Sequence, residues 1–155
     1  EKGFGLKKFA TDEEKKKREE KDKSMKMSER LNLYKDRQRN NLSENAYGAI
    51  VRLRMDNSHP LGFGYDKEYL SLKLRNRRYA YLESGWNVGT TQDSTSIVSG
   101  FVGFKAKQNF RESLVFGVEE IGRGSVVYMV DNPLFRGFWY NGKLLFGNAV
   151  FLVGN

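Results

Sequence analysis

The chain has 155 residues, of which 39 % are hydrophobic and 14 % aromatic, so it has enough apolar side chains for one modest core and is not a disordered polymer. It has no cysteine, which excludes disulfides, cysteine-based metal sites and thiol nucleophiles. The net charge of +8 suggests a nucleic-acid partner, but eleven Lys/Arg are interleaved with eight Asp/Glu between Asp12 and Arg39, as on a solvated helix face. We therefore do not favour nucleic-acid binding, and without a long apolar run we expect no membrane span.

Residues 1–47 are expected to form a charged helical segment. Thr11 is a suitable N-cap, and Glu14 lies three residues later, as a capping box requires. The helix should continue through Lys15–Lys26 and end or break at Asn40–Ser43.

Residues 48–155 are expected to form a strand-rich core that ends in a helix. Ala49–Met55 alternates apolar residues with arginines, and Asp56–Pro60 is a turn. Tyr69–Leu74 alternates three leucines with polar residues and is the clearest strand. Further strands are expected at Tyr79–Leu82, Trp86–Gly89, Ile97–Phe104, Leu114–Glu119 and Val126–Val130.

Helices and turns complete the expected α/β domain. Ala106–Glu112 is expected to form a short helical turn, Asn141-Gly142 a turn, and Leu144–Val153 an apolar closing helix. The opening, Glu1–Leu6, does not resemble a natural start, so we expect the chain to be a C-terminal piece of a larger protein that needs a partner polypeptide.

His59 is the only histidine, and a catalytic zinc needs about three protein ligands, so no metal site is expected. The residue precedes a proline in a turn and is expected to hydrogen-bond locally or to cap a strand end. A serine triad with Ser58, Ser99 or Ser125 is disfavoured because the Gly-x-Ser-x-Gly pattern is missing.

Carboxylate pairs are available at Glu119-Glu120 and at Asp56 with Asp66. Adjacent residues on a strand point to opposite faces, so Glu119-Glu120 is a poor catalytic pair. The glycine-containing segments 62–64, 100–103 and 122–124 do not open helices as phosphate-binding loops do.

Asp131 follows a buried strand, where open α/β sheets place ligands. We favour a structural role instead, in which it pairs with Arg136 or caps the turn at Pro133. The nearby aromatic residues are candidates for a groove but are more typical of core and rim. They are Phe135, Phe138, Trp139 and Tyr140.

Several ordered motifs resemble the end of large bacterial exported zinc carboxypeptidases of the carboxypeptidase A class. The resemblance covers nearly the whole chain and rests on the following segments: Ala49–Tyr65, Gly85–Gly89, Ser99–Gly103, Asp131–Trp139 and Leu145–Ala149. It implies a flavodoxin-like, three-layer domain similar to class I glutamine amidotransferases, located after the catalytic peptidase domain.

The resemblance also implies that catalysis belongs to another part of the parent protein. Zinc and the hydrolytic residues would belong to the parent peptidase, and no functional residue can be transferred to this chain, which lacks a His-x-x-Glu motif and a nucleophilic cysteine. The chain would then be a non-catalytic structural or docking part of a periplasmic, outer-membrane-associated or secreted protein. Its partner would be the rest of that polypeptide or a cleaved fragment of it, within a cell-envelope complex.

Two other functions stay open from the residues alone. One is a stand-alone β-rich glycan- or peptide-binding module that uses the regions of Trp86 and Trp139. The other is a basic nucleic-acid-binding domain centred on Lys15–Arg39.

Overall fold

The computed structural model describes residues 5–6, 20, 33–108 and 110–154. The expected helix start at Thr11 and Glu14 and the helix over Lys15–Lys26 lie outside the described residues. After a short 3₁₀ turn, η1 (Tyr34–Asp36), helix α3 spans Arg37–Glu44. The helix does not break at Asn40–Ser43, which lie inside α3, but it ends one residue later, at Glu44, close to the predicted end.

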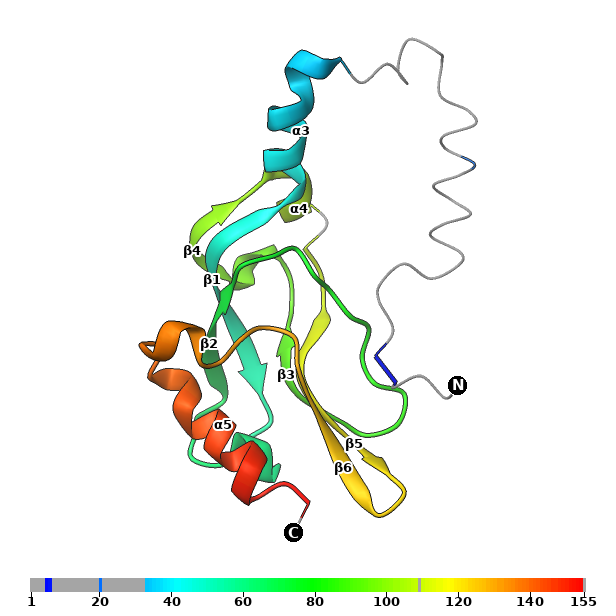
Figure 1. Ribbon diagram of the computed structural model, residues 1–155, viewed down its shortest axis with the longest axis vertical. Coiled ribbons are helices and arrows are strands. Elements are labelled where there is room, and N and C mark those ends of the chain that lie inside the picture. The colour runs from blue at the N-terminus through cyan, green and yellow to red at the C-terminus, as the bar shows by residue number, and fades with distance from the viewer. Residues whose placement is uncertain (1–4, 7–19, 21–32, 109, 155) are drawn as a thin grey trace.

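The described part of the chain forms a curved, half-barrel-like antiparallel sheet with few helices (Figure 1). The strand order is β2-β1-β3-β5-β6, and β4 pairs with β1 beside β3. The strands are β1 (Ala46–Met55), β2 (Glu68–Lys73), β3 (Trp86–Thr91), β4 (Ile97–Val102), β5 (Ser113–Ile121) and β6 (Gly124–Met129).

The predicted flavodoxin-like three-layer α/β fold is wrong. Every ladder between the described strands is antiparallel. Parallel neighbours need crossovers of a dozen or more residues, usually helical, whereas β5 and β6 are joined by a two-residue turn at Gly122-Arg123. Between β4 and β5 the helix α4 (Phe104–Gln108) has only five residues.

Helix α5 (Asn141–Phe151) confirms the expected closing helix, and its Leu145 belongs to the core cluster on the inner face of the sheet. It packs on the 3₁₀ turn η2 (Pro60–Gly62), where Asn148 Nδ2 donates to the carbonyls of Leu61 and Phe63 at 3.1 and 2.7 Å. Its Leu145 is fully buried, which contributes about 1.5–3 kcal/mol. The expected turn at Asn141-Gly142 is wrong, since both residues belong to the helix.

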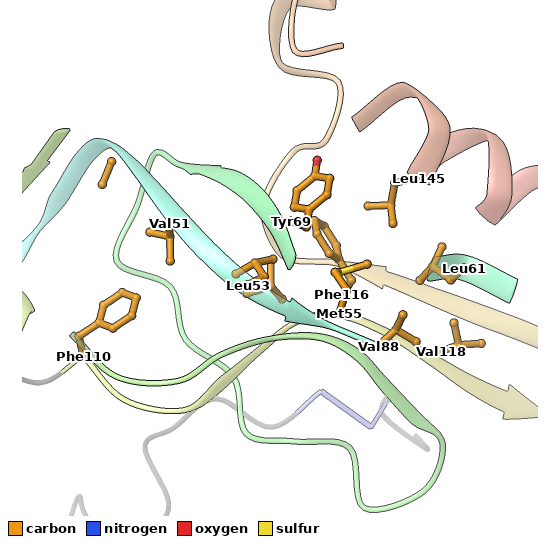
Figure 2. Close-up of a cluster of buried hydrophobic side chains, with 12 residues drawn as sticks. Val51, Leu53, Met55, Leu61, Tyr69, Val88, Phe110, Phe116, Val118 and Leu145 are labelled. Atoms are coloured by element: carbon orange, nitrogen blue, oxygen red, sulfur yellow. The ribbon is translucent and has the colours of Figure 1, made fainter. Parts of the chain in front are cut away.

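The main core lies between the inner face of β1, the strands β3 and β5, and α5 (Figure 2). Tyr69 of β2 is 2 % exposed and makes edge contacts with the rings of Tyr65 and Phe116, at 5.4 and 5.3 Å between centroids. The cluster of buried side chains consists of Ala49, Val51, Leu53, Met55, Leu61, Tyr69, Val88, Phe110, Val115, Phe116, Val118 and Leu145.

A second, smaller core lies under the connection from β2 to β3. Leu82, Leu114 and Tyr128 are buried there, and Tyr79 packs against them. The predicted strand at Tyr79–Leu82 is reduced to a single bridge between Tyr79 and Leu114. The connection thus packs as a loop over β5 and β6.

Candidate functional site

Strand β1 determines which face of β2 is buried. In an antiparallel pair, directly opposite residues share a face, and the register sets Ala49 against Lys73 and Leu53 against Tyr69. The inward residues of β1 are buried and its arginines point outward. The register therefore turns the polar side chains of β2 toward the core and its leucines toward solvent.

The inward polar side chains form a buried cluster with Asp131. Lys73 is 1 % exposed, and its Nζ lies 3.5 Å from Asp131 Oδ1. Ser71 Oγ donates to Asp131 Oδ2 at 3.0 Å. Burial raises the pKa of the Asp131 carboxyl, and the Lys73 ammonium and the Ser71 hydroxyl oppose that shift.

This cluster replaces the structural role that the sequence suggested for Asp131. The carboxylate pairs with Lys73 rather than with Arg136, whose guanidinium lies over the Phe135 ring at 5.2 Å. The turn at Pro133 is capped by Asn132, whose Oδ1 accepts from Leu134 N at 2.9 Å. Both predicted partners of Asp131 are therefore wrong.

The outward apolar side chains of β1 and β2, with Leu74 directly after β2, form an exposed surface, which we call the outer leucine face: Ile50, Leu70, Leu72 and Leu74. Leu70 is 41 % and Leu74 38 % exposed, while Ile50 and Leu72 are half-buried. Ile50 lies directly opposite Leu72, so the face is continuous across the two strands.

Basic residues border the outer leucine face. Arg52 pairs with Glu68 at 3.3 Å, with both side chains mostly exposed. Arg54 and Lys67 line two adjacent hollows of about 500 and 320 Å³ on the same part of the sheet. Exposed apolar surface with a polar rim is a feature of interaction sites, protein-binding surfaces among them.

The edge of β2 next to this face is covered by the chain before α5. Trp139 Nε1 and Asn141 Nδ2 both donate to the carbonyl of Leu70, at 3.3 and 3.2 Å. Trp139 thus has a structural role. Phe138 and Tyr140 beside it are 55 % and 74 % exposed, and Phe138 contacts Phe135 edge-on.

The structure does not assemble a triad around His59. Its Nδ1 accepts from Leu61 N at 3.0 Å, so the predicted local hydrogen bond is confirmed, and no carboxylate of the described residues hydrogen-bonds to the ring. Ser58 donates to Asp56, and Ser99 lies on β4 opposite Ile50. Ser125 lines the same pocket as His59, but no hydrogen bond joins them.

The candidate carboxylates do not form a catalytic pair either. Glu119 accepts from Tyr128 Oη at 2.6 Å and from Gly5 N at 3.2 Å, whereas Glu120 is exposed and lines the pocket of His59. The two side chains thus have separate environments, as the strand alternation predicts. Asp56 accepts from Ser58, which lowers the pKa of its carboxyl.

Across the described residues, no group of three or more His, Asp or Glu side chains is arranged to hold a metal ion. The described helices also include none with the length and apolarity needed to cross a bilayer. Compared with known proteins, the sequence matches no family model, no curated protein and no solved structure. The resemblance to exported zinc carboxypeptidases therefore stays a prediction.

Proposed function

We propose that this chain is a non-catalytic docking domain that binds another polypeptide segment through the outer leucine face. The single observation that carries the proposal is the orientation of β2, which buries Lys73 and leaves Leu70 and Leu74 more than a third exposed. Contiguous apolar surface of this kind is usually covered in the functional protein.

The surroundings of the face indicate the chemistry of the partner. Arg54 and Lys67 have no ion-pair partner among the described residues, so an amphipathic segment with leucine-like side chains and acidic neighbours would complement the surface. The motif resemblance suggests that this segment belongs to an exported zinc carboxypeptidase. We therefore propose the peptidase part of such a parent as the partner.

Helix α5 supports the same function from the opposite side of the sheet. Its inner residues Leu145 and Asn148 are buried, but Leu144 and Val150 are 45 % and 55 % exposed. A helix that is apolar on nearly all sides is typical of one buried on both faces.

Hydroxyl-radical footprinting tests the proposal. The 155-residue chain alone and the product of the whole gene are oxidised in parallel, and labelling is read by mass spectrometry. We expect Leu70 and Leu74 to be oxidised in the isolated chain and protected in the whole product. Equal labelling in both proteins would refute docking through this face.

A matched pair of variants separates docking from folding. Leu70→Ser/Leu72→Ser changes the outer leucine face, and Val98→Ser changes a side chain of similar exposure, 48 %, on β4. We expect only the double variant to lose the protection of Leu74. The exposed changes at Leu70 and Val98 should each alter the unfolding free energy by about 0.5 kcal/mol. Leu72 is half-buried, so circular dichroism verifies that the double variant is folded.

A further inference from the structure

A second concave surface lies away from the outer leucine face, between the start of β3, the β5–β6 hairpin, η2 and the chain that follows α5. It encloses about 460 Å³, which is within the range of small-ligand sites. Its side chains include His59, Trp86, Glu120, Arg123 and Ser125. None of them takes part in the docking surface.

Trp86 provides a flat aromatic surface in this pocket. It is 54 % exposed although it begins a strand whose next residues are largely buried. The His59 ring lies 5.9 Å from it at a tilt of 46°, which limits its rotation. The backbone just before Trp86 lies close to β5. A Cβ atom at Gly85, whose φ is +115°, would lie 2.3 Å from the carbonyl oxygen of Val118.

The polar side chains of the pocket provide both donors and acceptors. Glu120 and Arg123 have no hydrogen bond or ion pair among the described residues. His59 Nδ1 already accepts a backbone hydrogen bond, so the neutral ring carries its proton on Nε2 as a donor. Ser125 adds a hydroxyl beside the C-terminal chain.

An aromatic surface beside both hydrogen-bond donors and acceptors suits a neutral ligand with a hydroxyl-rich ring. The opposite charges of Glu120 and Arg123 leave little net attraction for a simple cation or anion, whereas a hydroxyl can donate to the carboxylate and accept from the guanidinium. The C–H face of a sugar ring suits the negative face of an indole. We propose that the pocket binds a saccharide unit stacked on Trp86, with its hydroxyls bound by Glu120 and Arg123.

The experiment uses the intact chain and three soluble probes: maltotriose, cellotriose and chitotriose. Binding is measured by saturation-transfer difference NMR and by tryptophan fluorescence up to about 10 mM probe, a range suited to weak sites. Trp139→Phe leaves Trp86 as the only tryptophan, so a fluorescence change in that variant reports on the pocket. We expect at least one probe to bind and to change that signal.

Variants then identify the binding groups. Trp86→Ala should abolish binding, and Glu120→Gln and Arg123→Gln should each weaken it roughly tenfold or more, as for hydrogen bonds to charged groups. Arg75→Gln, an exposed arginine outside the pocket, should leave the affinity unchanged. Circular dichroism verifies that each variant is folded.

The proposal is overturned if none of the three probes binds, or if a folded Trp86→Ala variant binds as well as the original chain. It is also overturned if the same pocket binds an acidic or basic tripeptide but no saccharide. None of these outcomes bears on the protection of Leu70 and Leu74, so the docking proposal is tested separately.

Discussion

The buried ion pair supports a quantitative prediction for Lys73→Met. At the observed 3.5 Å, two unit charges attract by about 5 kcal/mol with an effective dielectric constant of about 20. Removing Lys73 leaves the Asp131 carboxylate buried, with the Ser71 hydroxyl as its one remaining partner among the described residues. We expect Lys73→Met to lower the free energy of unfolding by about 3–5 kcal/mol near neutral pH, the usual cost of breaking a buried pair.

The loss should depend on pH in a defined direction. Burial raises the pKa of Asp131 above its unfolded value, so its contribution to stability is fully present at low pH and is lost as pH rises through the folded pKa. Lys73 opposes that shift, and its removal raises the folded pKa further. The destabilisation by Lys73→Met should therefore be larger at about pH 8 than at about pH 5.

Urea unfolding followed by circular dichroism measures these differences, and two further variants control them. Lys73→Met/Asp131→Asn should recover much of the loss, because the amide carries no charge and can still accept from Ser71. Arg52→Ala breaks an exposed pair of similar length, 3.3 Å, and should cost less than about 1 kcal/mol. A Lys73→Met cost below about 1 kcal/mol, or one independent of pH, would refute the reasoning.

Three further predictions concern the inner face and the pocket. Burial lowers the pKa of His59, the only histidine, so its NMR titration should fall below 6.5. The free energy of unfolding should therefore decrease as the pH falls from 6.5 toward the pKa of His59 in the folded protein. The His59→Gln variant should not show this decrease. A measured His59 pKa at or above 6.5 would contradict the prediction. Tyr69 Oη has no hydrogen-bond partner among the described residues. Tyr69→Phe should therefore leave the free energy of unfolding in urea unchanged or raise it. A loss above about 1 kcal/mol would show that the hydroxyl is hydrogen-bonded in solution. Asn148→Ala removes both donors to Leu61 and Phe63 and should cost about 1–3 kcal/mol in the same assay, whereas an unchanged midpoint would show that water replaces them.

Local patterns were sufficient to locate most strands. The alternation in Ala49–Met55 and Tyr69–Leu74 predicted β1 and β2 to within a few residues. It did not predict which face of β2 is buried, since either face satisfies the same period of two. That choice comes from the register with β1, where the arginines already occupy the outer face.

Tertiary contacts overrode local signals at the end of the chain. Asn141-Gly142 is a common turn pair, but here the pair begins α5. Gly142 lies so close to Pro133 that a Cβ would come within 1.8 Å of its carbonyl oxygen. The glycine is therefore needed for close packing rather than for a turn, and a single sequence does not distinguish the two uses.

The pocket was only partly predictable. Trp86 stands out in the sequence as an aromatic residue between polar neighbours. Glu120 was notable only as half of a carboxylate pair, and Arg123 only as part of the glycine-containing segment 122–124. They reach the pocket because Trp86 pairs with Val118 and because β5 and β6 turn at Gly122, whose φ is +65°. The Gly122-Arg123-Gly124 segment was a usable signal for that hairpin.

Strand β2 connects the buried ion pair with the docking proposal. A slip of β2 by one residue against β1 would bury the three leucines and expose Lys73. Each leucine that became fully buried would contribute about 1.5–3 kcal/mol of hydrophobic free energy. The observed register is held by the ring contacts of Tyr69 with Tyr65 and Phe116 and by the ion pair with Asp131. A partner that covers the leucines would add that hydrophobic gain without moving the strand. Docking should therefore stabilise this register above all others, and Lys73→Met should weaken partner binding even though Lys73 itself faces away from the outer leucine face.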